Sequence, residues 1–111
     1  MLLALGFAGL LTVAGCTSNV ELDPKGATVI DVRTPAEYAE GHLEGAINIS
    51  VAADDYEAQL GALPHEGRYI VYCRSGNRSA VATGDMQAKG FTNVTNAGGI
   101  SAASHTCLPH S

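Results

Sequence analysis

The sequence contains no tryptophan, and its aromatic residues are two phenylalanines and four tyrosines. A core in this 111-residue chain must therefore rest on aliphatic side chains, within one small domain. Basic residues are also few, with six Lys and Arg against eleven Asp and Glu. Because nucleic-acid binding needs clustered positive charge, this balance argues against a nucleic-acid partner and indicates only an acidic surface.

Charged side chains are absent from residues 1–20. The apolar stretch from Leu2 to Ala14 is too short to cross a bilayer as a helix, which needs about 20 residues. It is typical of the hydrophobic region of an export signal. We therefore expect a signal peptide at residues 1–15, a tether at 16–26 and a folded domain at 27–111.

The apolar stretch ends in Val13-Ala14-Gly15-Cys16, which resembles the lipobox of bacterial lipoproteins. In that family the chain is cut before the cysteine, and two or three attached acyl chains give firm anchoring. The resemblance implies lipidation of Cys16 and a membrane lipoprotein of the cell envelope that faces the periplasm. The alternative is a cytoplasmic protein in which this segment is a buried helix, although the glycines Gly6, Gly9 and Gly15 disfavour one.

Strand-like segments recur from Ala27 onward. Short β-branched or apolar runs predict strands at residues 27–32, 46–49, 68–72 and 92–96, with a further short strand at 20–22. The run at 68–72 has no polar alternation after its first residue, which is typical of a central parallel strand buried on both faces.

Helix signals lie between these strands. Thr34 as N-cap and Pro35 at the first helical position predict a short helix that ends at Gly41. Ser50 is expected to cap a helix at residues 51–63, and a third helix is expected at 79–89, stopped by a left-handed Gly90. This alternation predicts an α/β three-layer sandwich with a central parallel sheet of four to five strands.

Cys73 follows the strongest predicted strand and precedes a predicted helix, at the sheet edge where parallel α/β folds place their sites. Gly76 and Asn77 tolerate left-handed backbone, so successive amides can point inward, and the helix adds its positive end. Together with the charges of Arg74 and Arg78, these features favour an anion and lower the pKa of Cys73. The alternative is a cysteine that serves as a small buried apolar residue.

These motifs resemble the rhodanese homology domain. Residues 72–80, Tyr-Cys-Arg-Ser-Gly-Asn-Arg-Ser-Ala, are similar to the active-site loop of its single-domain members. Residues 31–38 and 41–49 resemble the upstream signature, and 90–94 with 98–100 resemble the C-terminal stretch. The similarity runs from about Ala27 to Pro109 and implies the rhodanese-like fold.

The resemblance implies a sulfurtransferase with Cys73 as the catalytic residue. Its thiolate would take sulfur from a small anionic donor such as thiosulfate, hold it as a persulfide, and pass it to cyanide or a thiol, small or protein-borne. The resemblance implies no cofactor. The donor would be bound by the loop residues Arg74, Ser75, Gly76, Asn77, Arg78 and Ser79. Asp31 would support the site by tying loops together, and Arg33 would support it by pairing with a nearby carboxylate. Of these two residues, Arg33 is the better candidate to face the substrate.

Two alternatives stay open. Related cell-cycle phosphatases and arsenate reductases use a loop with five residues between cysteine and arginine, whereas four residues, 74–77, separate Cys73 from Arg78. The smaller loop favours a sulfur atom over a tetrahedral oxyanion. The other alternative is a non-catalytic rhodanese-fold module that carries sulfur or docks a redox partner.

Three histidines and Cys107 are further candidates for a functional role. His42 resembles the family's structural histidine before a tight turn at Glu44-Gly45. The alternative is a catalytic base, which thiolate chemistry does not need. A metal site at the C-terminal cluster of His105, Cys107 and His110 would need a fourth ligand and a firm scaffold, so we expect no metal. A disulfide between Cys107 and Cys73 would inactivate the protein in an oxidising compartment.

Three residues depart from the family pattern. Ala103 stands where a tryptophan is usual, and Asp85 where an apolar residue is usual. Gly84 costs a helix about 1 kcal/mol relative to alanine. These departures predict loose packing in the C-terminal third of the chain.

Overall fold

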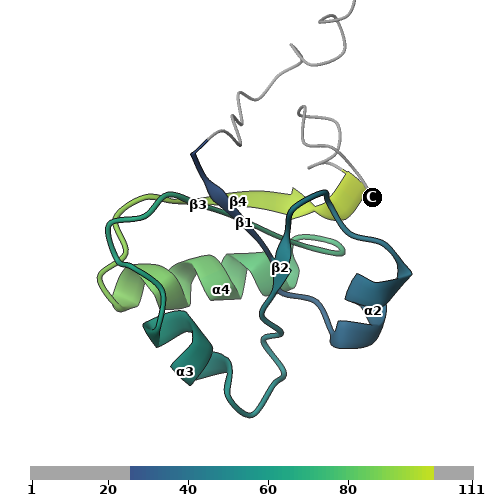
Figure 1. Cartoon of the computed structure of the whole chain (residues 1–111), viewed down its shortest axis with the longest axis horizontal. Helices are drawn as coiled ribbons and strands as arrows, with labels where there is room; N and C mark the ends of the chain where they lie inside the picture. The colour runs from purple at the N-terminus through teal and green to yellow at the C-terminus, as the bar shows by residue number, and fades with distance from the viewer. Residues whose placement is uncertain (1–25, 102–111) are drawn as a thin grey trace, which may run out of the picture.

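Four parallel strands form the centre of the fold. The computed structural model describes residues 26–101, in which the strands are β1 (Thr28–Asp31), β2 (Ile47–Asn48), β3 (Tyr69–Cys73) and β4 (Val94–Gly99). Their order across the sheet is β2-β1-β3-β4, and every neighbouring pair is parallel. The connections contain α2 (Pro35–Glu40), α3 (Tyr56–Gly61) and α4 (Asn77–Ala88) (Figure 1). The predicted α/β class with a central parallel sheet is confirmed.

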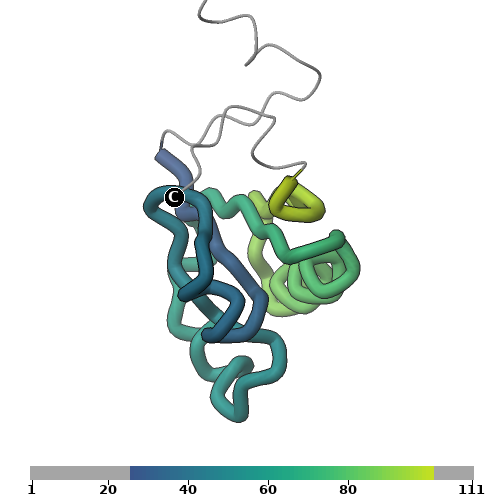
Figure 2. The backbone as a smooth tube through the Cα atoms, turned by 90° about the vertical axis from the view of Figure 1, so that its right-hand side faces the viewer, coloured from purple at the N-terminus to yellow at the C-terminus, as the bar shows by residue number. Residues whose placement is uncertain are grey.

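Hydrophobic residues pack on both faces of this sheet, because successive side chains of a strand point to opposite sides. Ile30 and Val71 belong to a cluster with residues of α3 and α4, including Leu60, Ala82 and Met86. Val29 and Ile70 belong to a second cluster, against which Tyr38 of α2 packs. The view in Figure 2 separates the blue α2 region from the green α4. All five residues of β3 are buried, as predicted.

The predicted start of α2 is confirmed, and it includes a capping interaction that was not predicted. The Thr34 hydroxyl accepts a hydrogen bond from the Glu37 amide at 3.2 Å, and the Glu37 carboxylate accepts one from the Thr34 amide at 3.0 Å. This reciprocal capping box satisfies two amides that a helix leaves unpaired. The first turn of α2 thus holds the Glu37 carboxylate in a fixed position, and the same carboxylate belongs to the site described below.

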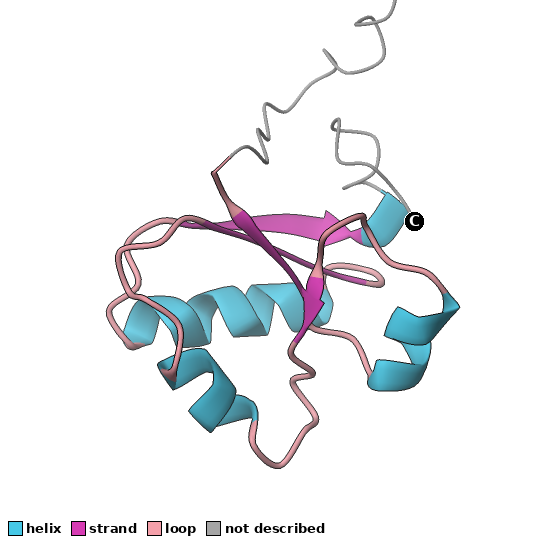
Figure 3. Cartoon of the chain, in the orientation of Figure 1, coloured by secondary structure: helices cyan, strands magenta, loops and turns pink. Residues whose placement is uncertain are grey.

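The helix predicted at residues 51–63 is wrong in extent, because α3 spans only Tyr56–Gly61. Turns occupy the connection after β2, which is drawn as a long loop in Figure 3. The Ser50 hydroxyl accepts from the Ala52 amide at 3.1 Å and so stabilises a turn rather than a helix end. The consecutive aspartates Asp54 and Asp55 explain the delay, since short polar side chains favour turns and caps over helix interiors.

Helix α4 begins at Asn77, two positions before the predicted residue 79. Gly76 has the left-handed backbone that the sequence allowed, at φ 104°, whereas Asn77 is the first residue of the helix. At the other end, Gly90 has φ 101°, which confirms it as the left-handed residue after the helix. The earlier start of α4 brings its first turn directly against the cysteine loop.

Asp85 has a partner that the sequence did not indicate. The Tyr56 hydroxyl of α3 donates a hydrogen bond to the Asp85 carboxylate of α4 at 2.7 Å. In the same helix, Ala82 and Met86 are fully buried and belong to one hydrophobic cluster with Tyr56. The prediction of loose packing is therefore wrong for α4.

Several predictions fall outside residues 26–101: the signal peptide and most of the tether, the strand at 20–22, Cys16, Ala103 and the cluster His105, Cys107 and His110. Within the described range, no helix has both the length and the apolar character needed to cross a membrane.

Gly84→Ala is expected to raise the free energy of unfolding by about 1 kcal/mol, because alanine is the better helix former. The position is exposed, and a Cβ there would meet no atom within 4 Å. Gly45→Ala is the matched control: it also has open space, but its φ of +80° should make alanine destabilising by about 1 kcal/mol. Urea denaturation of both variants measures this, and shifts of the same sign would contradict the prediction.

Candidate active site

Cys73 ends β3 and is fully buried beneath the loop that leads into α4. Its Sγ atom accepts a hydrogen bond from the Gly76 amide, with N and S 2.9 Å apart. The Ser79 hydroxyl lies 3.5 Å from the same sulfur. The backbone therefore curls around the sulfur, as the loop composition predicted.

Hydrogen bonding controls the ionisation of this thiol. Burial alone would raise the pKa of Cys73, because a buried thiolate loses its hydration. The hydrogen bonds that the thiolate can accept from the Ser79 hydroxyl and from the amides of Ser79, Gly76 and Ser75 outweigh the effect of burial, so the pKa lies below its ordinary value. The predicted direction is confirmed, and hydrogen bonds rather than the arginines produce the largest lowering effects.

The loop is also in contact with the end of β4. A register shift between β3 and β4 leaves Ala97 unpaired and sets Gly98 and Gly99 opposite Tyr72 and Cys73. A Cβ on Gly99 would lie 2.5 Å from the Arg74 carbonyl oxygen, a distance that no real side chain tolerates. Glycine at this position is therefore required for β4 to approach the cysteine loop.

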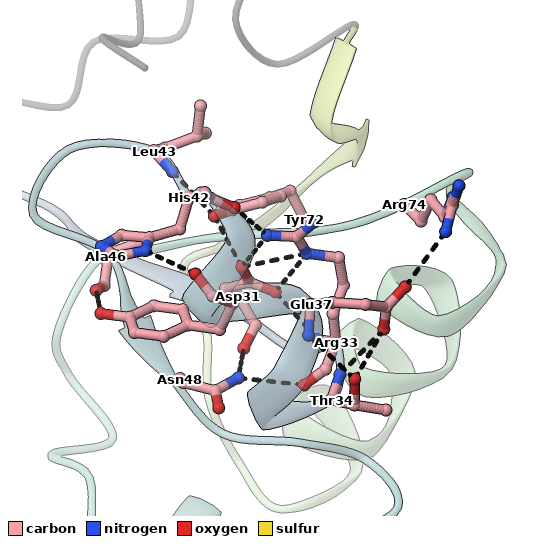
Figure 4. Close-up of polar contacts among 12 residues, drawn as sticks. Asp31, Arg33, Thr34, Glu37, His42, Leu43, Ala46, Asn48, Tyr72 and Arg74 are labelled. Carbon is pink, nitrogen blue, oxygen red and sulfur yellow. Dashed lines mark hydrogen bonds and ion pairs between the residues drawn. The ribbon is translucent and has the colours of Figure 1, made fainter. Parts of the chain in front are cut away.

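The two loop arginines lie against Glu37 of α2 rather than around the sulfur. Arg78 makes two hydrogen bonds to the Glu37 carboxylate, at 2.8 and 3.1 Å. Arg74 reaches the same carboxylate at 3.7 Å, and its side chain is 73% exposed (Figure 4). The charges of both arginines are therefore partly neutralised by Glu37, a pairing that the sequence did not reveal.

Glu37 was not among the residues predicted for the site. The available signal was the capping-box spacing from Thr34 to Glu37, which marks the glutamate as oriented toward the helix start. The hydrogen bonds from Arg78, followed by that from the Thr34 amide, lower the pKa of Glu37 to about 2. Glu37 therefore stays ionised at any ordinary pH and keeps Arg78 in place.

Asp31 ties loops together, as predicted. Its fully buried carboxylate accepts hydrogen bonds from the Arg33 amide at 2.9 Å, from the Arg33 guanidinium at 2.7 to 3.1 Å, and from the Tyr72 hydroxyl at 2.8 Å. Tyr72 in turn accepts from the Leu43 amide at 2.9 Å. Figure 4 shows this network reaching from β1 to β3 and to the turn before β2.

Arg33 has a structural role. Besides Asp31, its guanidinium donates to the Gly41 carbonyl at 2.7 Å, and the residue is only 6% exposed. The predicted pairing of Arg33 with a carboxylate is confirmed, and the burial of its guanidinium does not support the prediction that Arg33, rather than Asp31, faces the substrate. The contacts of His42 agree with the predicted structural role: the centroids of the His42 and Tyr38 rings are stacked 3.7 Å apart, and Nδ1 of His42 lies 2.9 Å from the Tyr38 carbonyl oxygen.

Ser79 and Asn96 form a contact that the sequence did not reveal. The Ser79 hydroxyl donates to the Asn96 side-chain carbonyl at 2.7 Å, across 17 positions of the chain. Of the other predicted loop residues, Ser75 and Asn77 are exposed. In the described part of the chain, no three His, Cys, Asp or Glu side chains are grouped to hold a metal ion.

A cysteine at the end of a central parallel strand, enclosed by amides ahead of a helix, defines an α/β domain with a cysteine-centred anion loop. The chain belongs to the family of rhodanese-like domains, whose model matches residues 19–105.

Relatives and solved structures agree with this assignment. The chain is 39% identical over 72 residues to thiosulfate sulfurtransferase PspE of Escherichia coli, covering 64% of this chain and 68% of that protein. It is 38% identical over 95 residues to the chloroplastic thiosulfate sulfurtransferase 16 of Arabidopsis thaliana, covering 76% and 79%. A solved E. coli structure, described as rhodanese with anions, superposes with a TM-score of 0.65 at 30% identity and covers 77% of this chain and 96% of that one.

Glu37→Gln is expected to reduce stability at neutral pH and to lose that effect in acid. The pKa of Glu37 is lowered from 4.5 to about 2, so its stabilising charge is complete above 4.5 and is lost as the pH falls through 2. The difference in unfolding free energy between wild type and Glu37→Gln should therefore shrink between pH 4.5 and 2. Urea titrations across this range measure it.

The control for this experiment is Glu44→Gln, which removes the charge of an exposed glutamate in a turn. It should change stability little at any pH. A constant difference between wild type and Glu37→Gln down to pH 2 would contradict the assignment.

Proposed function

We propose that this chain is a sulfurtransferase that moves sulfane sulfur through a persulfide on Cys73. The observation that carries the proposal is the Gly76 amide aimed at the Cys73 sulfur at 2.9 Å, within a loop that lowers the pKa of the thiol. Such a loop stabilises negative charge on sulfur, which is needed in both the thiolate and the persulfide. The names of the relatives support the same reaction.

The proposed reaction has two displacement steps. In the first, the Cys73 thiolate attacks the outer sulfur of thiosulfate; the sulfur–sulfur bond of the donor breaks, and sulfite leaves with the electron pair. In the second, cyanide or a thiolate attacks the outer sulfur of the persulfide and regenerates the Cys73 thiolate. Neither step needs an external oxidant or reductant.

The arrangement of charges supports a small anionic donor. Arg74 is largely exposed and only loosely paired with Glu37, so its guanidinium is available to an incoming anion. Arg78 is held more firmly by Glu37 and fixes the first turn of α4 beside the sulfur. The close approach of the Gly76 amide to Sγ favours a single added sulfur atom over a bulkier phosphate group.

Cys73→Ser is expected to abolish thiocyanate formation from thiosulfate and cyanide, because the serine hydroxyl is not ionised near neutral pH. The assay uses the purified full chain, with Cys107→Ser as the matched control that should retain activity. Equal thiocyanate formation by wild type and Cys73→Ser, or none by either, would contradict the proposed sulfurtransferase activity. A mass gain of one sulfur on Cys73 without turnover would instead identify a sulfur carrier.

We also propose that the protein is a lipoprotein anchored through Cys16, facing the periplasm. The support is the sequence Val13-Ala14-Gly15-Cys16 at the end of an apolar, uncharged stretch. Two or three acyl chains on that cysteine would hold the domain at the membrane surface.

Cys16→Ala should move the full chain from the membrane fraction to the supernatant of bacteria that express it, and should remove the incorporation of labelled palmitate. Cys107→Ala is the control with the same change elsewhere and should leave both unchanged. Wild-type protein without label, or labelled equally in Cys16→Ala, would contradict lipidation at this residue.

A further inference from the structure

The Ser79 hydroxyl has one proton and several acceptors around it. The closest is the Asn96 side-chain carbonyl at 2.7 Å; the Gly76 carbonyl lies at 3.1 Å, and the Gly98 carbonyl and the Cys73 sulfur both lie at 3.5 Å. A hydroxyl donates only one proton at a time. The position of that proton therefore decides whether Ser79 can stabilise a thiolate on Cys73.

Asn96 has a defined orientation at this site. Its side-chain oxygen accepts the Gly98 amide at 2.9 Å as well as the Ser79 hydroxyl. An amide N–H can only donate, so the atom facing Gly98 must be the oxygen of Asn96 and not its nitrogen. This oxygen consequently attracts the Ser79 proton in the resting state.

With the Ser79 proton on Asn96, the free electron pairs of the Ser79 oxygen face Cys73. The neutral thiol is then favoured, because its S–H can donate to Ser79. A thiolate in the same place would face an acceptor, until the Ser79 hydroxyl turns away from Asn96 and toward the sulfur. Ionisation of Cys73 is thus coupled to the loss of the bond from Ser79 to Asn96.

We propose that Asn96 is a positioning residue that withholds the Ser79 proton from Cys73 and thereby limits how readily the nucleophile ionises. The bulge after Asn96 makes this possible, because it sets Gly98 where its amide holds the Asn96 side chain. The proposal rests on the proposed function only in taking Cys73 as the nucleophile. It assigns to β4 a role in the reactivity of the site beyond making room for the loop.

Other charged groups surround the loop. They are Arg74 in the loop itself, Arg78 on α4, Glu37 on α2, and the buried pair of Asp31 and Arg33 on and after β1. Replacement of Asn96 by alanine changes none of these groups, so a change in the ionisation of Cys73 in that variant is attributable to the hydrogen bonds of Ser79 and Asn96. Asn96→Asp adds a carboxylate, and the part of its effect that is due to this charge alone persists without the Ser79 hydroxyl.

The test is the pH dependence of alkylation of Cys73 by iodoacetamide, followed by mass spectrometry of the peptide that contains it. Asn96→Ala should lower the midpoint by on the order of one pH unit, the shift that one hydrogen bond to an ionised group produces. Asn96→Asp, which retains a stronger acceptor with the same shape, should raise the midpoint. Asn93→Ala, the same substitution at an exposed position before β4, should leave it unchanged.

The Ser79→Ala background separates positioning from general damage. Without the hydroxyl, Asn96→Ala should cause no further shift, and the effect of Asn96→Asp should fall to less than half. An unchanged or raised midpoint in Asn96→Ala, or equal shifts with and without Ser79, would overturn the proposal. If Asn96→Ala fails to fold, the shifts of the midpoint caused by Asn96→Asp with and without the Ser79 hydroxyl test the proposal. Equal shifts would overturn it.

Alkylation does not require sulfur transfer, so the two proposals fail separately. If the alkylation midpoint shifts but the protein makes no thiocyanate, the role of Asn96 as a positioning residue is retained and the proposed sulfurtransferase activity is rejected. Normal thiocyanate formation with an unshifted midpoint would reject the role of Asn96 alone.

Discussion

The buried carboxylate of Asp31 is the constraint on which the rest of the site depends. A buried charge is strongly destabilising unless it is paired and hydrogen-bonded, and Asp31 receives donors from Arg33 and Tyr72. Because those donors lie on the segment after β1 and on β3, satisfying the carboxylate fixes both strands at the edge from which Cys73 emerges. Arg33 extends the same network to the Gly41 carbonyl after α2. Removing Arg33 would leave the Asp31 charge uncompensated in the interior, and removing the Tyr72 hydroxyl would leave the carboxylate one donor short.

Glu37 connects this framework to the cysteine loop. One carboxylate caps α2 and also pairs with Arg78 at the start of α4. The arginines are thus partly neutralised before any substrate arrives, and the anion-stabilising property of the loop comes mainly from its amides and from Ser79. The loop amides are already oriented toward the sulfur, so they need no reorganisation when the Cys73 thiol ionises, whereas the Ser79 hydroxyl must turn away from Asn96.

The sequence predicts the features of this protein that are local in the chain. The strand, Cys73, Gly76 and α4 are contiguous, and a strand followed by a glycine turn and a helix leaves few alternatives. The Thr34 cap and the left-handed Gly90 follow from the same short-range rules. The pairing of Glu37 with Arg78 spans 41 positions, and that of Ser79 with Asn96 depends on a bulge, so neither follows from spacing. Asp85 appeared anomalous for the same reason, because its partner Tyr56 lies on another helix.

The requirement for glycine at position 99 has a consequence for the newly made chain. Since β4 follows β3 and α4 in the chain, Cys73 leaves the ribosome before the residues of β4 that enclose it. During that interval the thiol lacks its neighbours Asn96, Gly98 and Gly99, and its chemistry is that of an ordinary cysteine in an open chain. The hydrogen-bonded surroundings of Cys73 are therefore completed only when β4 joins the sheet.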